Sequence, residues 1–106
     1  MPKLTSPNKT EQEFLDRAAS LLPEFRPDLL VQFEPLTLIL PSGARYTPDF
    51  VFWDGPKIVA IVETKGAHIH SPAALLRFKE ARATFRHVQF YFAQKLGKDD
   101  WAVEAG

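Results

Sequence analysis

Three polar residues stand inside segments that are otherwise apolar: Asp49, Glu63 and Lys65. Glu63 and Lys65 are two positions apart, so on a β-strand their side chains point to the same face. Gly66 follows directly, where the backbone could approach a ligand closely. Two carboxylates and one ammonium group at a sheet end suit a hard divalent cation with a phosphate, because Mg²⁺ is usually held by one or two carboxylates, waters and substrate oxygens. The lysine could then orient or deprotonate a water, or neutralise charge on the phosphate.

Whether these side chains converge depends on the turn between their two segments. A two-residue turn at Asp54-Gly55 would place Asp49 and Glu63 on opposite faces of the sheet. A three-residue turn that includes Pro56, or a bulge with the same one-residue offset, would place Asp49, Glu63 and Lys65 on one face. Because proline cannot donate a ladder hydrogen bond, we expect the second arrangement.

The segment before these strands predicts an amphipathic helix over residues 10–22, with apolar side chains at helical spacing. Thr10 followed by Glu13 indicates a capping box at its start. Glu11 then projects from the apolar face at the first turn, where a carboxylate needs a partner. A second interpretation of Glu11 is a favourable interaction with the helix dipole.

The remaining chain alternates strands with one more helix. Apolar and β-branched residues predict strands over residues 31–40, 45–53 and 57–65. Ser71-Pro72 is typical of a helix start, and that helix is expected to end near residue 86. A strand follows over residues 87–93, and the mixed segment 95–106 predicts no element. The order is helix, three strands, helix, strand, which indicates an α/β fold whose sheet is covered on both faces.

The phrases Tyr46-Thr47-Pro48-Asp49-Phe50 and Glu63-Thr64-Lys65-Gly66, on consecutive strands in this element order, resemble the PD-(D/E)XK nuclease superfamily. The likeness covers residues 10–93 and is greatest to small phage or mobile-element nucleases, including Holliday-junction resolvase-like and transposase-endonuclease-like members. It implies a restriction-endonuclease-like αβββαβ core, with a mixed central sheet flanked by helices, in a single domain over residues 1–106.

The resemblance also implies roles for individual residues. Asp49 and Glu63 would bind Mg²⁺ or Mn²⁺, and the backbone carbonyl of Thr64 would complete the metal shell. Lys65 would assist the attacking water. Glu11 matches a further metal-binding glutamate that many members carry on the first helix. The implied catalytic set is therefore Asp49, Glu63, Lys65 and Glu11, and the implied metal ligands are Asp49, Glu63, Thr64 and Glu11.

Charge is balanced overall but segregated along the chain. There are 13 basic and 13 acidic residues among 106. Residues 1–64 hold six basic and nine acidic side chains, whereas residues 65–98 hold seven basic and one acidic. Basic side chains that neutralise phosphates supply most sequence-independent affinity for nucleic acid, although a solvated helix face is the competing interpretation. For His68 and His70 the alternatives are simple exposure to solvent and a pair of transition-metal ligands. The predicted nucleic-acid contacts are Arg45, His68, His70, Arg77, Lys79, Arg82 and Lys95.

Composition excludes several classes of protein. The absence of cysteine excludes a disulfide framework, a thiolate zinc site and a cysteine nucleophile. The longest apolar runs are too short to cross a bilayer, and the first residues lack the apolar core of a secretory signal. We therefore expect no membrane contact and a location in the cytoplasm of a bacterial or phage-infected cell. So short a chain leaves little surface for specificity, which favours a homodimer or a partner subunit.

The sequence thus predicts a Mg²⁺-dependent DNA endonuclease acting on duplex or branched DNA. The alternatives are a catalytically silent nucleic-acid-binding module, a nuclease subunit of a larger complex, and a plain α/β interaction domain.

Overall fold

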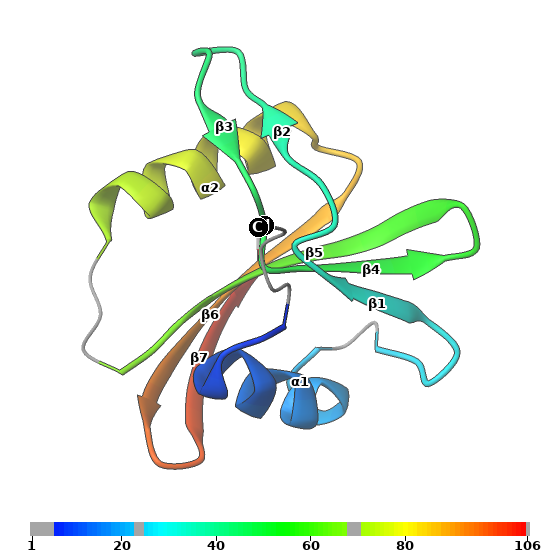
Figure 1. Ribbon diagram of the computed structural model, residues 1–106, viewed down its shortest axis with the longest axis vertical. Coiled ribbons are helices and arrows are strands. Elements are labelled where there is room, and N and C mark those ends of the chain that lie inside the picture. Colours follow the sequence, from blue (N-terminus) through cyan, green and yellow to red (C-terminus); the bar gives the residue numbers. More distant parts are fainter. Residues whose placement is uncertain (1–5, 23–24, 68–70, 106) are drawn as a thin grey trace.

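The computed structural model describes residues 6–22, 25–67 and 71–105 (Figure 1). Within these residues the chain forms two helices and seven strands. They are α1 (Lys9–Leu21), β1 (Leu30–Phe33), β2 (Leu38–Ile39), β3 (Arg45–Tyr46), β4 (Phe50–Asp54), β5 (Lys57–Lys65), α2 (Pro72–Thr84), β6 (Gln89–Gly97) and β7 (Asp100–Ala105).

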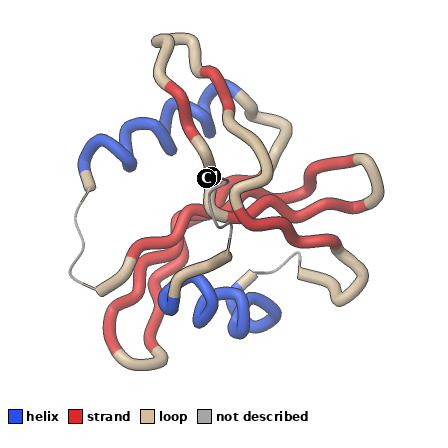
Figure 2. The backbone as a smooth tube through the Cα atoms, viewed as in Figure 1, coloured by secondary structure: helices blue, strands red, loops and turns tan. Residues whose placement is uncertain are grey.

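The central sheet is mixed and has five strands in the order β1-β4-β5-β6-β7. Strands β5 and β6 are parallel and are joined through α2, whereas the other neighbours are antiparallel. Helix α1 lies on one side of this sheet, and α2 lies on the other side together with the small β2–β3 hairpin (Figures 1 and 2). The fold class is therefore α/β, as the sequence predicts.

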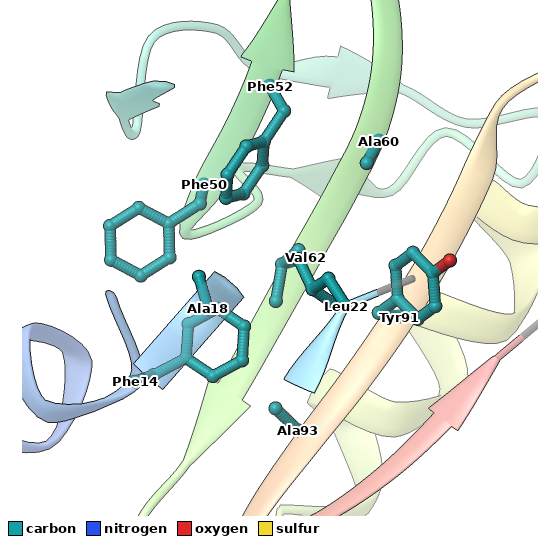
Figure 3. Packing of buried hydrophobic residues seen from close by; sticks show 9 residues of the cluster. All are labelled: Phe14, Ala18, Leu22, Phe50, Phe52, Ala60, Val62, Tyr91 and Ala93. Atoms are coloured by element: carbon teal, nitrogen blue, oxygen red, sulfur yellow. The ribbon is translucent and has the colours of Figure 1, made fainter. Parts of the chain in front are cut away.

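Two apolar layers hold the helices to the sheet. Phe14 and Ala18 of α1 pack against Phe50 and Phe52 of β4 and Val62 of β5 (Figure 3). On the other face, the buried side chains are Leu40, Tyr46, Val51, Ile61, Phe78, Ala81 and Phe90. Successive residues of β4 and β5 thus face opposite layers, and the predicted coverage of both sheet faces is confirmed.

Two predicted strands are each interrupted in the structure. Residues 31–40 split into β1 and β2, because Glu34 adopts a positive φ of 46° and is followed by Pro35. Residues 45–53 split into β3 and β4, with Pro48 and a bend at Asp49 between them. A proline has no N–H for a ladder, so each break occurs where pairing would fail. The freed inner segments pair with each other as the β2–β3 hairpin.

The turn between β4 and β5 also differs from the expectation. Asp54 pairs with Lys57, so the turn contains only Gly55 and Pro56, and the predicted three-residue turn is wrong. A bulge supplies the offset instead, because Phe52 pairs with Ala60 whereas the next residue, Trp53, pairs with Ile58.

The C-terminal segment, for which the sequence predicts no element, completes the sheet. Strand β6 continues to Gly97, and β7 returns antiparallel beside it. Trp101 of β7 packs edge-on against Phe14, with ring centroids 5.6 Å apart. Only Trp101 and Val103 of β7 join the α1-side layer, a pattern too short to reveal a strand from sequence. Neither helix in the described residues is long and apolar enough to cross a membrane.

Candidate active site at the end of strand β5

Asp49 is fixed by the strand beside it. It lies in the bend before β4, and only 7% of its surface is exposed. Its Oδ2 accepts two hydrogen bonds of 2.8 Å, from the backbone N–H and from the hydroxyl of Thr64. Burial raises the pKa of Asp49, and the two bonds from Thr64 oppose that rise. The carboxylate is therefore buried, oriented and held against the end of β5.

Glu63 is the second buried carboxylate, with 5% of its surface exposed. The hydroxyl of Tyr46 donates a 3.0 Å hydrogen bond to its Oε1, and the ammonium group of Lys65 lies 3.3 Å from its Oε2. Burial, followed by the charge of Asp49, raises the pKa of Glu63 to about 7. Burial and the charge of Glu63 also raise the pKa of Tyr46.

Glu11, and not Glu13 as predicted, forms the capping box of α1. Asn8 is the residue before α1, and Asn8 and Glu11 exchange two 2.8 Å hydrogen bonds in a capping box. The predicted box of Thr10 and Glu13 is wrong, and Glu13 instead forms an ion pair with Lys95. Asn satisfies the first amides of a helix as well as Thr does, so both positions fit the pattern.

Glu11 still reaches the site while it caps the helix. Burial raises its pKa most, and the charges of Asp49 and Glu34 raise it further. It lines the same hollow as Asp49, and its predicted role as a metal ligand stays a prediction. The Glu11 carboxylate accepts a hydrogen bond from the backbone N–H of Asn8, and the same side chain lines this hollow.

Two hollows meet at Lys65, which lines both. The first, on the α1 side, has a volume of about 340 Å³ and is lined by Asn8, Thr10, Glu11, Asp49, Thr64, Lys65 and Gly66. The second, on the α2 side, has a volume of about 320 Å³ and is lined by Arg45, Tyr46, Thr47, Glu63, Lys65, Ser71, Ala74 and Arg77.

Asp49 lines the α1-side hollow and Glu63 lines the α2-side hollow, while Lys65 lines both. The charge of Asp49 contributes to the raised pKa of Glu63, so the two carboxylates lie close together. A single face shared by Asp49, Glu63 and Lys65 stays a prediction. Asp49 precedes β4, and its carboxylate accepts the hydrogen bonds from Thr64 that orient it. A wider hollow of about 600 Å³ beside Lys95 and Glu13 contains neither of the two buried carboxylates.

The donor set at the end of β5 fits a hard cation in part. Among the described residues, no three Asp, Glu or His side chains are grouped closely enough to hold a metal ion. Two carboxylates that are buried and repel each other nevertheless remain, one on each side of Thr64. Mg²⁺ is commonly held by one or two carboxylates with waters and substrate oxygens completing the shell. Asp49, Glu63 and the Thr64 carbonyl would be the protein ligands if such an ion bound here.

The predicted nucleic-acid contacts separate into groups. Arg45 and Arg77 line the α2-side hollow. Lys79 is exposed on α2, whereas Arg82 lies 3.9 Å from Glu104 and its guanidinium lies over the ring of Phe78, which is 5.7 Å away. Lys95 is on the opposite face of the sheet. His68 and His70 lie outside the described residues.

Tyr46 and Ser42 support the candidate site, and neither is predicted from the sequence as a site residue. Tyr46 belongs to the quoted motif, and its place three residues before Asp49 was the available signal. Ser42 fixes the hairpin that carries Tyr46, since its backbone N–H and hydroxyl donate to the two carboxylate oxygens of Glu80, at 2.8 and 2.7 Å. No sequence signal links Ser42 to Glu80, because they are far apart in the chain.

Comparison of the chain with models of known families, with curated proteins and with solved structures gives no match in any of the three.

Proposed function

We propose that this protein is a metal-dependent DNA endonuclease that hydrolyses a phosphodiester bond at the end of β5. The observation that carries the proposal is the pair of buried carboxylates, Asp49 and Glu63, on either side of Thr64 with the ammonium group of Lys65 beside them. Burying two like charges this close is costly unless a cation or a reaction makes use of them. Mg²⁺ or Mn²⁺ relieves that cost.

The order of elements supports the same proposal. With the β2–β3 hairpin set aside as an insertion, α1, β1, β4, β5, α2 and β6 follow one another as αβββαβ. The antiparallel β1-β4-β5 unit and the parallel β5–β6 crossover form a mixed sheet with a helix on each face. Strand β7 adds one edge strand to that arrangement. This order matches the one expected of the restriction-endonuclease-like core that the motif resemblance implies, and it supports the proposal on that ground.

Each residue then has a defined task. A bound divalent ion would lower the pKa of a water molecule and neutralise charge on the phosphate. Asp49 and Glu63 would bind that ion, each held in one orientation by a hydrogen-bond donor from a neighbouring segment. Lys65 lines both hollows, so its ammonium group can donate to the attacking water or to a phosphate oxygen. Glu11 shares the Asp49 hollow and would accept a hydrogen bond from water there.

The test is a cleavage panel of duplex, nicked, single-stranded, flap, gapped and four-way-junction DNA, run with Mg²⁺ and with Mn²⁺. We expect metal-dependent cleavage of at least one substrate, abolished in Asp49→Ala and Lys65→Ala. Asp16→Ala and Lys57→Ala are matched controls, because Asp16 is exposed on α1 and Lys57 is exposed at the end of β5 opposite to Lys65. Folded protein that leaves every substrate intact with either ion would refute the proposal, and Asp49→Ala or Lys65→Ala protein that cleaves at the parent rate would refute the site.

A catalytically silent nucleic-acid-binding module is the second candidate. It is favoured by the ion pair between Lys65 and Glu63 and by the two separate hollows for Asp49 and Glu63. Metal titration distinguishes the two, since a silent module binds DNA without metal-dependent turnover. A native-mass measurement in the same series tests the homodimer or partner subunit that the small chain favours.

A further inference from the structure

The α2-side hollow has the chemistry of a phosphate-binding site. Three cationic side chains, Arg45, Lys65 and Arg77, line it against a single carboxylate, that of Glu63. Lys65 already has Glu63 as its partner, which leaves two guanidinium groups for an incoming anion. Arginine binds phosphate through paired N–H donors, and its charge persists at every accessible pH.

The start of α2 adds to this positive character. Ser71 and Ala74, from the first turn of α2, line the same hollow, and the Ser71 side chain makes no capping hydrogen bond to the described residues. Unsatisfied amides and the helix dipole make such a helix start favourable for an anion. Thr47 contributes a further hydroxyl to the wall. The hollow thus combines two arginines, a helix start and hydroxyl groups around one volume.

Its position relative to Lys65 suggests what the anion is. Lys65 lines both hollows, so an anion in the α2-side hollow lies next to the residue that the proposed function places beside the scissile phosphate. In a nucleic-acid strand the neighbouring charged group along the backbone is another phosphodiester. Lys79, which is exposed, and Arg82, which is paired with Glu104, do not line the hollow. Arg77 is therefore the basic side chain of α2 that lines it.

We propose that Arg45, Arg77 and the start of α2 bind a backbone phosphodiester of a DNA strand, adjacent to the phosphodiester that is cleaved. This inference rests on the proposed function and adds a positioning subsite to it. In this arrangement the α1-side hollow, lined by Asp49 and Glu11, would hold the attacking water. The α2-side hollow, lined by the two arginines, would hold the DNA strand.

The experiment measures DNA binding without cleavage, by fluorescence anisotropy in EDTA over a series of salt concentrations. Arg45→Gln and Arg77→Gln should each weaken binding about tenfold, as expected for loss of one charge-assisted contact. Each should also reduce the slope of log affinity against log salt by about 0.9 for duplex or about 0.7 for single-stranded DNA.

The matched control is Arg86→Gln, which removes the same charge from an exposed arginine after α2. Its neighbours Phe85 and His87 lie beside Lys57, at the opposite end of β5 from Lys65. We expect it to change the affinity by less than about twofold, because it makes no phosphate contact in this arrangement. Equal losses in all three variants, or no loss in Arg45→Gln and Arg77→Gln, would overturn the subsite.

Further measurements separate this inference from the function on which it rests. Metal-dependent cleavage with DNA binding that is insensitive to Arg45 and Arg77 removes the subsite and leaves the nuclease. Arginine-dependent binding without cleavage in Mg²⁺ or Mn²⁺ removes the nuclease and leaves the subsite, and no DNA binding removes both. Inorganic phosphate is the final probe: if it occupies the hollow as tightly as DNA does, a small-anion site replaces the strand subsite.

Discussion

The hydroxyl of Tyr46 donates a 3.0 Å hydrogen bond to Oε1 of Glu63, and both residues are almost completely buried. The donor comes from the β2–β3 hairpin and the acceptor from the central sheet, so this bond fixes the hairpin relative to the proposed active site. It leaves the other carboxylate oxygen of Glu63 with Lys65.

Tyr46→Phe removes this donor while retaining the ring. Because the hydrogen bond orients the Glu63 carboxylate, we expect metal-dependent cleavage to slow about tenfold, the effect of losing one charge-assisted bond. The measurement is kcat at saturating metal, with KM for DNA recorded beside it. Tyr91→Phe is the matched control, since its side chain belongs to the α1-side layer. An unchanged kcat in Tyr46→Phe would show that the bond does not position Glu63 for the reaction.

Thr64→Val tests the corresponding support of Asp49. Valine keeps the shape and the backbone N–H that donates to Oδ2 but deletes the hydroxyl that donates to the same atom. We expect roughly 1 to 2 kcal/mol lower stability to unfolding, since a buried carboxylate loses one of its donors. The apparent affinity for Mg²⁺ should fall as well, measured by titrating cleavage with metal. Thr84→Val, on the exposed end of α2, should leave that affinity unchanged, and equal effects from both substitutions would contradict the assignment.

Glu63 should make the metal-free protein lose stability as the pH rises. Its pKa is raised from 4.5 to about 7 in the folded state, so the folded protein holds this proton more tightly than the unfolded chain does. Stability therefore falls between about pH 4.5 and about pH 7 and stays reduced above that, by roughly 3 kcal/mol for a shift of this size. Denaturant unfolding in EDTA measures it.

Glu63→Gln provides the control for this pH dependence, because glutamine does not titrate. We expect its stability to change much less over the same interval. Mg²⁺ should stabilise the parent protein more at about pH 8 than at about pH 5, since the ion binds the deprotonated carboxylate. In EDTA, a parent protein whose stability to unfolding rises from about pH 5 to about pH 8 would contradict the buried position of Glu63.

The elements that the sequence predicts best are those that depend on neighbouring residues in the chain. Helical spacing locates α1, Ser71-Pro72 locates the start of α2, and a continuous apolar run locates β5. The two prolines at positions 35 and 48 were visible in the sequence, but their effect depends on the partner strands that they interrupt.

The site shows the same limit at single residues. The motif places Asp49, Glu63 and Lys65 near one another, and the structure agrees. The supporting contacts come from elements brought together only by tertiary packing: Tyr46 from the hairpin, Arg77 from α2, and Asn8 before α1. Spacing along the chain carries no information about such contacts.

Glu80 should control the site from a distance, through the hairpin. Its two carboxylate oxygens accept the hydrogen bonds from Ser42 at the hairpin turn, and the hairpin carries Tyr46 to Glu63. In Glu80→Ala the turn loses both bonds, so we expect slower cleavage through a less well-placed Tyr46. A double-mutant cycle measures this coupling: Glu80→Ala should slow cleavage severalfold in the parent and much less in Tyr46→Phe, because residues that act through one contact are not additive.

The cycle also separates positioning from general loss of stability. If Glu80→Ala acts only by destabilising the fold, it will slow cleavage equally in the parent and in Tyr46→Phe. Glu104→Ala is the matched control, since it removes a carboxylate that faces Arg82 of the same helix without contacting the hairpin turn. It should leave kcat within about twofold of the parent in both backgrounds, as expected for an exposed ion pair. A coupling as large for Glu104 as for Glu80 would show that the effect passes through α2 as a whole and not through the bond between Glu80 and Ser42.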